Sequence, residues 1–229
     1  LAFESIEAGE QELLSDQSLQ GGILHIAASS LALQGRLLHA LARYRREYPH
    51  VRLCLTNRSA AQGIAAVQDG LVDLAVAAEG AAVPDTLSAQ KIGEIREIPI
   101  CGPAFAGLTE GPVSLRRLAE YPIISLIEGT SSHDFYADLF MQNDLTFSPD
   151  VEVETTAQVL PVVQSNLGIG FVPREMLYGT PELTGIYPLT LDTPIPPRSL
   201  YLFQRKAQPL SVAARQLRQL LLEGAPCGE

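Results

Sequence analysis

The sequence predicts an α/β protein with two lobes of the same plan, joined by two crossover segments. Strand-like apolar runs alternate with helical patterns along most of the 229 residues, which is typical of a parallel sheet with helical crossovers. This alternation occurs twice, with nearly equal spacing between the elements. Two further apolar segments, 92–101 and 199–203, stand where the chain would pass from the first lobe to the second and return.

The first half of the chain has the pattern of a βαβαβ unit. We expect strands over 23–28, 51–55 and 71–76, and helices over 33–48 and 60–69. Pro49 ends the first of these helices, and Gly70 closes the second. Such a unit requires a parallel sheet with right-handed crossovers.

The second half repeats this pattern. We expect strands over 122–127, 151–154 and 169–172, and helices over 133–143 and 157–166. Pro161 must lie in the first turn of its helix or kink it, so we expect that helix to begin a residue or two later than 157. A last helix over 210–222 has one broad apolar face and would pack on the first lobe.

The composition is that of a folded protein without a general affinity for nucleic acid. Hydrophobic residues make up 46% and charged residues 18% of the chain. The net charge of -10 excludes binding to DNA through a general positive field. No apolar run approaches the roughly 18 residues of a membrane span, and no signal-peptide pattern is seen. Cys54, Cys101 and Cys227 are too few and too scattered for a disulfide framework or a zinc site, and we interpret the first two as core residues.

Small polar residues follow most of the predicted strands. In an open parallel sheet, ligands bind beyond the carboxyl ends of the strands, where helix N-termini favour a small anion. The residues at these positions are Ser29, Ser30, Thr56, Asn57, Arg58 and Ser59 in the first lobe and Thr130, Ser131, Ser132, Thr155 and Thr156 in the second. Each could equally be a plain helix N-cap, with Ser131 or Ser132 capping the helix over 133–143, and both interpretations stay open.

The sequence shows no catalytic or metal-binding constellation. Its four histidines are scattered, and it has no G-x-S-x-G, H-E-x-x-H or phosphate-binding P-loop motif. We therefore expect no enzymatic activity, no metal and no cofactor. Arg58 and Arg174 are the cations best placed to pair with a ligand carboxylate, and whether they or His133 contact a ligand stays open.

Six short motifs run along the chain in order. They are GILHI at 22–26, LLxxLxxY at 37–44, YPxVxL at 48–53, GLVDLAV at 70–76, LxxLAxYPII at 115–124 and GIGFVP at 168–173. Each is loose alone, but together and at this spacing they resemble the LysR-type transcriptional regulators, specifically their C-terminal effector-binding domain. The resemblance covers about 22–222, and residues 1–20 look like the end of the linker helix.

This resemblance implies two Rossmann-like lobes joined by two crossover strands, a periplasmic-binding-protein-like fold of type 2. Residues 21–97 and 204–229 would form lobe one, and residues 98–203 would form lobe two. A small effector would bind in the interlobe cleft. With the strand-end residues included, the expected effector-binding residues are Ser29, Ser30, Asn57, Ser59, Gly129, Thr130, Ser131, Thr156 and Phe203. The family often has Glu-Gly after the second strand, whereas Thr56 to Ser59 stand here, which leaves the effector class open.

We therefore expect the effector-sensing domain of a transcriptional regulator. It would bind a small metabolite, an anion or carboxylate, and control by allostery the DNA binding of a homodimer or homotetramer. The helix over 33–48 and the strand over 51–55 would form half of the subunit interface.

The remaining expectations concern partners and location. DNA would be bound only by an N-terminal winged helix-turn-helix domain, which we expect to be absent from this chain, and RNA polymerase is a further candidate partner. We expect a cytoplasmic location and no membrane association. The alternative function is a solute-binding protein of the same fold, which would require export.

Overall fold

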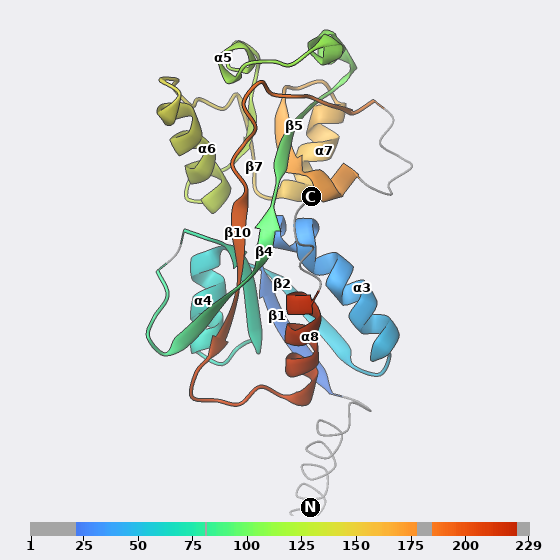
Figure 1. Ribbon diagram of the computed structural model, residues 1–229, viewed down its shortest axis with the longest axis vertical. Coiled ribbons are helices and arrows are strands. Elements are labelled where there is room, and N and C mark those ends of the chain that lie inside the picture. Colours follow the sequence, from blue (N-terminus) through green and yellow to red (C-terminus); the bar gives the residue numbers. More distant parts are fainter. Residues whose placement is uncertain (1–21, 81, 178–184, 224–229) are drawn as a thin grey trace, which may run out of the picture. The chain divides into compact units, whose positions relative to one another are not determined.

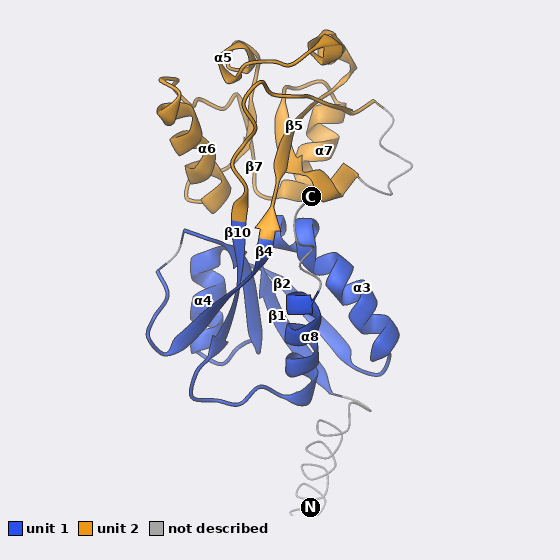
Figure 2. Cartoon of the chain, in the orientation of Figure 1, with its two compact units in different colours: residues 1–93, 199–229 blue, residues 94–198 orange. Residues whose placement is uncertain are grey.

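The computed structural model describes residues 22–80, 82–177 and 185–223. The chain divides into two compact units (Figure 2): unit 1 comprises Leu1–Gly93 and Ser199–Glu229, and unit 2 comprises Glu94–Arg198. The expected boundaries at 97/98 and 203/204 therefore shift, and residues 199–203 belong to unit 1 because they pair with one of its strands. Residues 1–20, expected as the end of a helix, lie outside the described residues.

Unit 1 contains a five-stranded sheet with the order β2-β1-β3-β10-β4 (Figure 1). Its strands are β1 (Ile23–Ala28), β2 (Arg52–Asn57), β3 (Leu74–Ala78), β4 (Leu87–Ile95) and β10 (Arg198–Arg205). β1 runs parallel to both β2 and β3, so the predicted parallel βαβαβ unit is confirmed. β10 returns antiparallel to β3, with Leu200 opposite Ala78 and Phe203 opposite Ala75.

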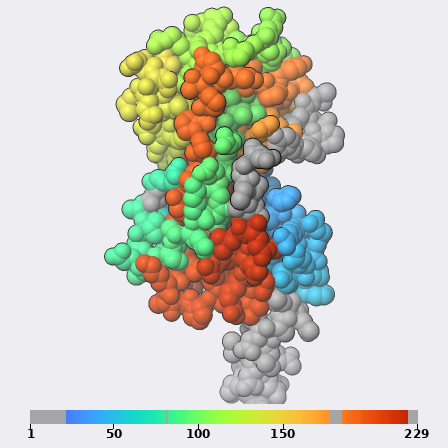
Figure 3. All heavy atoms as spheres, in the orientation of Figure 1, coloured from blue at the N-terminus to red at the C-terminus, as the bar shows by residue number. Residues whose placement is uncertain are grey.

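Helices cover both faces of this sheet. α4 (Ala60–Gln68) lies on one face, and α3 (Leu38–Glu47) and α8 (Val212–Glu223) lie on the other (Figure 1). The Tyr44 hydroxyl donates to the Ala213 carbonyl oxygen at 3.1 Å, and the Tyr48 hydroxyl donates to Gln216 Oε1 at 3.1 Å. α8 and α3 are therefore neighbours on the surface of unit 1 (Figure 3), and the prediction that the last helix packs on the first lobe is confirmed.

The helix predicted over 33–48 differs in its first turns. It begins with α2 (Ser30–Ala32) and passes through a π-helical turn, η1 (Leu33–Leu37), before α3. The Leu38 amide donates to the Leu33 carbonyl oxygen, five residues back. A π turn adds one residue without ending the helix, and the apolar spacing resumes after it, so the sequence pattern does not reveal it.

Two strand boundaries in unit 1 also differ from the prediction. β2 extends to Asn57, so Thr56 and Asn57 belong to the strand and do not follow it. β3 begins at Leu74, not at Leu71, whose side chain is 66% exposed. Asp73 holds the preceding turn, since its Oδ2 accepts a hydrogen bond from the His25 amide at 2.8 Å.

Unit 2 repeats the plan of unit 1 with shorter strands. Its strands are β5 (Glu97–Cys101), β6 (Ile124–Leu126), β7 (Val151–Val153), β8 (Gly170–Pro173) and β9 (Tyr187–Pro188). One sheet has the order β8-β5-β9, and a second pairs β6 with β7 in parallel. A parallel bridge between Ile123 and Ile169 connects the two sheets. β5 runs antiparallel to β8, as β10 does to β3 in unit 1.

Side chains alternate between two faces in unit 2, as expected for strands. Ile123 and Phe171 pack with α6 (Ser131–Gln142), whereas Ile124 and Val172 pack with α7 (Thr156–Gln164). These two helices therefore cover opposite faces. The remaining helices are the 3-10 helices η2 (Pro103–Glu110) and η3 (Arg174–Leu177) and the short α5 (Leu115–Leu118).

The prediction that α7 begins after residue 157 is wrong. The helix begins at Thr156 and contains Pro161 in its interior. Proline has no N–H group, so the carbonyl of Ala157 lacks its intrahelical donor. Ala157 and Pro161 are both exposed, and water can satisfy that carbonyl, which explains why the helix tolerates the proline.

The cysteine interpretation is confirmed for Cys101, which is buried. Its thiol donates to the Phe105 carbonyl oxygen at 3.6 Å, and burial raises the pKa of the thiol. Cys54 is only half-buried on β2, and Cys227 lies outside the described residues. Among the helices of the described ranges, none has the length and apolar character that crossing a membrane would need.

Candidate functional site

The first group of predicted site residues lies in unit 1, at the end of β1. Ser29 is the N-cap of α2, and its Oγ accepts a hydrogen bond from the Ala32 amide at 3.2 Å. The Ser29 amide donates to the Val76 carbonyl oxygen on β3 at 3.1 Å, which holds the turn against the sheet. Ser30 is half-buried in the first helical position. Ser29 is thus engaged as a cap, and Ser30 is the hydroxyl that this turn can offer to a ligand.

Asn57 and Ser59 lie at the end of the neighbouring strand. Asn57 pairs with Ala28, so it stands directly beside the turn at Ser29. Ser59 caps α4 through a capping box with Gln62: Ser59 Oγ accepts from the Gln62 amide at 3.3 Å, and Gln62 Oε1 accepts from the Ser59 amide at 3.1 Å. Asn57 is therefore the better placed of the two to contact a ligand.

Phe203 occupies the hydrophobic core of unit 1. Its side chain is 3% exposed and packs in a cluster with Ala27, Ile64 and Val67. A ligand would reach it only by displacing core side chains. Its packing accounts for its position, and its contact with an effector stays a prediction.

The second group lies in unit 2, at the first turn of α6. Gly129 has a φ of 81°, in the region that favours glycine, and turns the chain into the helix. Thr130 is the N-cap, in place of Ser131 or Ser132: its Oγ accepts from the His133 amide at 3.2 Å and donates to the Ile127 carbonyl oxygen at 2.8 Å. The amides of Ser131 and Ser132 remain as first-turn donors without intrahelical partners.

A buried arginine is held against this turn. Arg198 is 1% exposed, and its Nη1 donates to Ser132 Oγ at 2.9 Å and to Glu97 Oε2 at 3.1 Å. Its Nη2 donates to the carbonyl oxygen and to the Oγ of Ser131, at 3.0 and 3.1 Å. The guanidinium carbon also lies 4.8 Å from the centre of the Phe135 ring. One guanidinium therefore fixes both serines of the first turn of α6.

Glu97 balances the charge of Arg198. It is 5% exposed, and burial raises the pKa of this carboxyl group while the adjacent Arg198 opposes the rise. Burial and the charge of Glu97 also raise the pKa of the Tyr136 hydroxyl well above its ordinary value of 10.0. Arg198 and Glu97 are paired, and Asp134 in the first turn of α6 adds a negative charge near the positive end of its dipole. The backbone amides of this turn, and not a net positive charge, are therefore what it can offer to an anion.

Thr156 is placed less favourably than the α6 residues. It is the first residue of α7 and is 1% exposed. The preceding residue, Thr155, is the N-cap, and its amide donates to Gln158 Oε1 at 3.0 Å. Contact between Thr156 and an effector therefore stays a prediction.

The structure thus places the predicted site residues in two groups. Ser29, Ser30, Asn57, Ser59 and Phe203 belong to unit 1, and Gly129, Thr130, Ser131 and Thr156 belong to unit 2. Ser29 and Ser30 lie beside Asn57, and Gly129, Thr130 and Ser131 form one turn. Within the described ranges, no group of three or more His, Cys, Asp or Glu residues could hold a metal ion.

Sequence reasoning missed Glu97 and Arg198, although each carries a signal. Each is a charged residue at or next to an apolar crossover segment, and the two charges have opposite sign. Their partnership spans 101 positions of sequence, so no local pattern could reveal it. The structure brings them together because both crossover segments pass the first turn of α6.

Two α/β units of one plan, linked by two crossing segments, define a ligand-binding domain of the type 2 periplasmic-binding-protein-like fold. The fold class predicted from the sequence is therefore confirmed. The family model described as the LysR substrate binding domain matches residues 17–226, and the chain belongs to this family. It is the substrate-binding domain of a LysR-type transcriptional regulator, as the six motifs predicted.

Individual relatives agree with this assignment. The HTH-type transcriptional activator IlvY of Haemophilus influenzae is 25% identical over 204 residues, which cover 86% of this chain and 68% of that protein. The chain thus spans about two thirds of the length of this relative.

Solved structures show the same fold. The regulatory domain of CcmR from Synechocystis PCC6803, in complex with 2-PG, has a TM-score of 0.75 at 16% identity, covering 90% of this chain and 98% of that one. The BenM effector binding domain with its effector benzoate has a TM-score of 0.71 at 16% identity, covering 88% and 91%.

Proposed function

We propose that the chain senses a small organic anion, most simply a carboxylate, and that its first turn of α6 binds the anionic group. The observation that supports this proposal is that hydrogen bonds from Thr130 and Arg198 fix the first turn of α6. Thr130 caps the helix, and Arg198 holds the side chains of Ser131 and Ser132, so the first turn of this twelve-residue helix is fixed while its amides lack intrahelical partners. A preorganised set of donors loses little entropy when it binds an anion.

The turn at Ser29 and Ser30 in unit 1 is a further candidate for contact with an effector. Ser30 is half-buried at the start of α2, and Asn57 stands beside the same turn. The ligands of the similar domains support the chemical class, since benzoate, the effector of BenM, is a carboxylate.

Arg198 suggests how a bound anion would change the rest of the domain. Glu97 lies on β5, close to the point where the chain enters unit 2, and Arg198 is the last residue before it leaves. An anion at the α6 turn would attract the guanidinium and compete with Glu97 for its charge. The contacts that hold both crossover segments to α6 would then change in free energy. A ligand can shift an equilibrium between two arrangements only through such differential interaction.

The wider assignment concerns the assembled regulator. We propose a cytoplasmic homodimer or homotetramer in which α3 and β2 form half of the subunit interface. β2 is at the edge of its sheet, and Leu55 on β2 and Leu38 on α3 are 42% and 45% exposed. DNA would be bound by a winged helix-turn-helix domain outside this chain, and RNA polymerase would be contacted by the assembled regulator. Control of DNA binding, and not catalysis, would be the output.

The experiment is a thermal-shift screen of this chain against aromatic and aliphatic carboxylates, followed by titration calorimetry. A ligand at 100 times its Kd adds about 2.7 kcal/mol to the stability of the folded chain. We expect Ser30→Ala and Thr130→Ala to weaken binding of the selected ligand about tenfold each. Ser30→Ala would remove one hydrogen bond to the ligand, and Thr130→Ala would remove the cap that fixes the amides of the first turn of α6.

Ser114→Ala provides a matched control for Thr130→Ala. Ser114 caps α5 in the same unit, and its Oγ accepts from the Arg117 amide at 3.1 Å. Loss of either cap lowers stability by about 1 kcal/mol, but only the Thr130 variant should lose affinity. Equal affinity in all three variants, or a screen in which no carboxylate binds, would contradict the proposed site and ligand class.

A further inference from the structure

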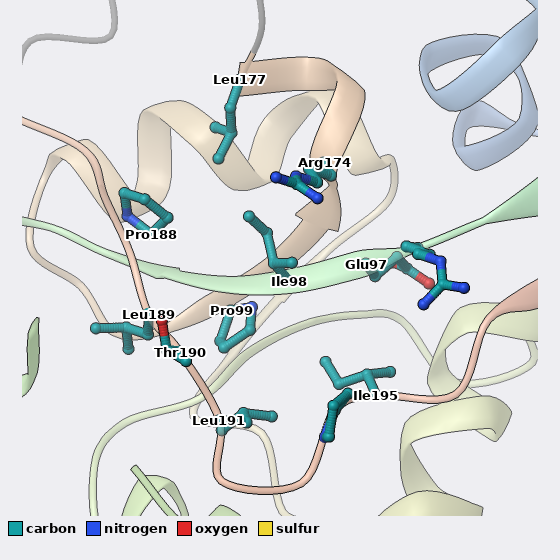
Figure 4. Close-up of a pocket in the computed structure, with 12 residues that line it drawn as sticks. Glu97, Ile98, Pro99, Arg174, Leu177, Pro188, Leu189, Thr190, Leu191 and Ile195 are labelled. Atoms are coloured by element: carbon teal, nitrogen blue, oxygen red, sulfur yellow. The ribbon is translucent and has the colours of Figure 1, made fainter. Parts of the chain in front are cut away.

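Unit 2 contains a cavity of about 470 Å³ beside β5 (Figure 4). Figure 4 shows Ile98 and Leu177 pointing toward each other, with the side chain of Arg174 next to them. Apolar side chains make up most of the wall: Ile98, Pro99, Leu177, Leu189, Leu191 and Ile195. The volume lies within the range of pockets that take small organic ligands.

The cavity follows from the unequal pairing of the two edges of β5. On one edge, β8 pairs with β5 over Glu97–Ile100. On the other edge, β9 is only two residues long and pairs with Ile100 and Cys101 alone. The chain then turns away, and the Leu189 amide makes one more bond, to the Pro99 carbonyl oxygen at 2.8 Å. Pro99 has no N–H group to satisfy on this edge, so the space beside it can stay open.

Prolines make the walls of the cavity rigid before any ligand arrives. Pro99, Pro188 and Pro194 all line it, and each has a fixed φ. A preformed apolar cavity needs little ordering on binding, which favours affinity.

Two arginines line the cavity. Arg96 and Arg174 both line it, and the Arg174 amide donates to the Arg96 carbonyl oxygen at 3.0 Å, so the two residues stay side by side. The acidic residue of the wall, Glu97, is paired with Arg198 and so presents little repulsion to an anion. A guanidinium is a planar fork that matches the geometry of a carboxylate.

We propose that this cavity is a second ligand site, which takes a small amphipathic carboxylate with an apolar ring or chain. The apolar body lies among Ile98, Leu177 and Ile195, and the carboxylate pairs with Arg174, with Arg96 adding to the field. The cavity shares only the wall residue Glu97 with the charge pair at the α6 turn, and the residues that would contact this ligand lie outside that turn, so the site does not depend on the function proposed above.

The test is a titration of the chain, labelled at its isoleucine methyl groups, with 2-naphthoate, and in parallel with the uncharged 2-naphthalenemethanol. Ile98 and Ile195 report on the cavity. Ile127, whose carbonyl oxygen accepts from Thr130, reports on the α6 turn, and Ile64 reports on the core of unit 1. We expect 2-naphthoate to shift the methyl signals of Ile98 and Ile195, and to bind more tightly than the alcohol.

Two variants separate the charged and apolar parts of the site. Arg174→Gln should weaken 2-naphthoate about tenfold and leave the alcohol unchanged, because only the carboxylate uses the guanidinium. Thr190→Trp, at an exposed position of the cavity wall, should fill the cavity and weaken both compounds. Arg116→Gln, an exposed arginine on α5, is the control for charge and should change neither.

The proposal is overturned if 2-naphthoate leaves the Ile98 and Ile195 signals unmoved up to its solubility limit. It is also overturned if Ile127 shifts alone, which would assign the compound to the α6 turn. Melting curves establish that each variant is folded. If the folded Thr190→Trp variant binds both compounds as tightly as the unchanged chain does, the cavity is also excluded as their site.

Discussion

At the residue scale, Gly170 determines how closely α7 can approach β8. A Cβ atom added there would lie 2.4 Å from Val159 Cγ1 and 2.9 Å from Val163 Cγ2, and both valines are buried on α7. Such distances are too short for two carbon atoms, and close-packed interiors relax only in part. The glycine of the motif at 168–173 thus has a packing reason: it lets the helix lie directly on the strand.

We predict that Gly170→Ala lowers the free energy of unfolding by about 1–3 kcal/mol, the usual cost of an extra group in a packed core. Urea denaturation followed by circular dichroism measures this change. Gly107→Ala is the control, because a Cβ atom at Gly107 meets nothing within 4 Å, and its effect should stay within about 0.5 kcal/mol. Equal stability of the two variants would show that α7 can move away from β8 at little cost.

The sequence predicted that small polar residues follow the strands, but it did not show which of them cap a helix and which contact a ligand. Ser, Thr and Asn are favoured both as caps and as ligand contacts, so the alternatives stayed open from the sequence. The structure shows which of them are caps, since Ser29, Ser59 and Thr130 accept from the amides of their own helices, and their contact with a ligand stays a prediction. Ser131 and Ser132 instead accept from Arg198.

At the element scale, the first turn of α6 depends on a pair of charges carried by two other segments. Arg198 and Glu97 are both nearly inaccessible to solvent, with side chains 2% and 3% exposed, and their nitrogen and oxygen atoms are 3.1 Å apart. Removing one member of such a pair leaves an uncompensated buried charge, whereas replacing both by apolar residues removes the cost of desolvating them.

We predict that Arg198→Met and Glu97→Leu each lower the free energy of unfolding by about 3–5 kcal/mol, and that the double variant loses much less than the sum. A double-mutant cycle by urea denaturation at neutral pH measures the coupling. Arg116→Met, at an exposed arginine of the same unit, serves as the control and should change stability by no more than about 0.5 kcal/mol. Additive losses would mean that the two charges act independently of each other.

At the scale of the whole molecule, the net charge decides which partners this chain can bind by itself. The chain has 16 basic and 26 acidic residues, for a net charge of -10. Non-specific binding to DNA depends on neutralising phosphates with clustered cations, and a net negative chain repels the duplex instead. Non-specific binding of this chain to DNA therefore does not account for a role in transcription.

We predict that this chain alone does not bind duplex DNA at physiological salt. Fluorescence anisotropy of a labelled duplex should stay unchanged as the chain is added, with and without a carboxylate ligand. A cationic peptide serves as the positive control for the assay. Micromolar binding that weakens with added salt would contradict the prediction and would indicate a basic surface sufficient to hold DNA.

Apolar spacing and short motifs were sufficient to predict the repeated α/β plan, most of its helices and strands, and the family. Those conclusions depend on apolar spacing and on short motifs, which are local properties of the chain. The strand over 23–28 and the closing helix over 210–222 were therefore predicted within a residue or two. Predictions from local patterns failed at two places. Pro161 lies inside α7, where water can satisfy the carbonyl that the proline leaves without a donor. In η1, a π-helical turn inserts one residue into the helix without changing the apolar spacing after it.

Which charged residues pair, and where a cavity remains, depend on how distant segments pack together in the fold. Glu97 and Arg198 are far apart in the sequence, and they pair because β5 and the start of β10 pass the same helix turn. The cavity beside β5 exists because β9 stops after two residues, a length that depends on how the chain leaves the sheet. Both features are set by packing between distant segments, and the free energy of such contacts does not appear in any local pattern.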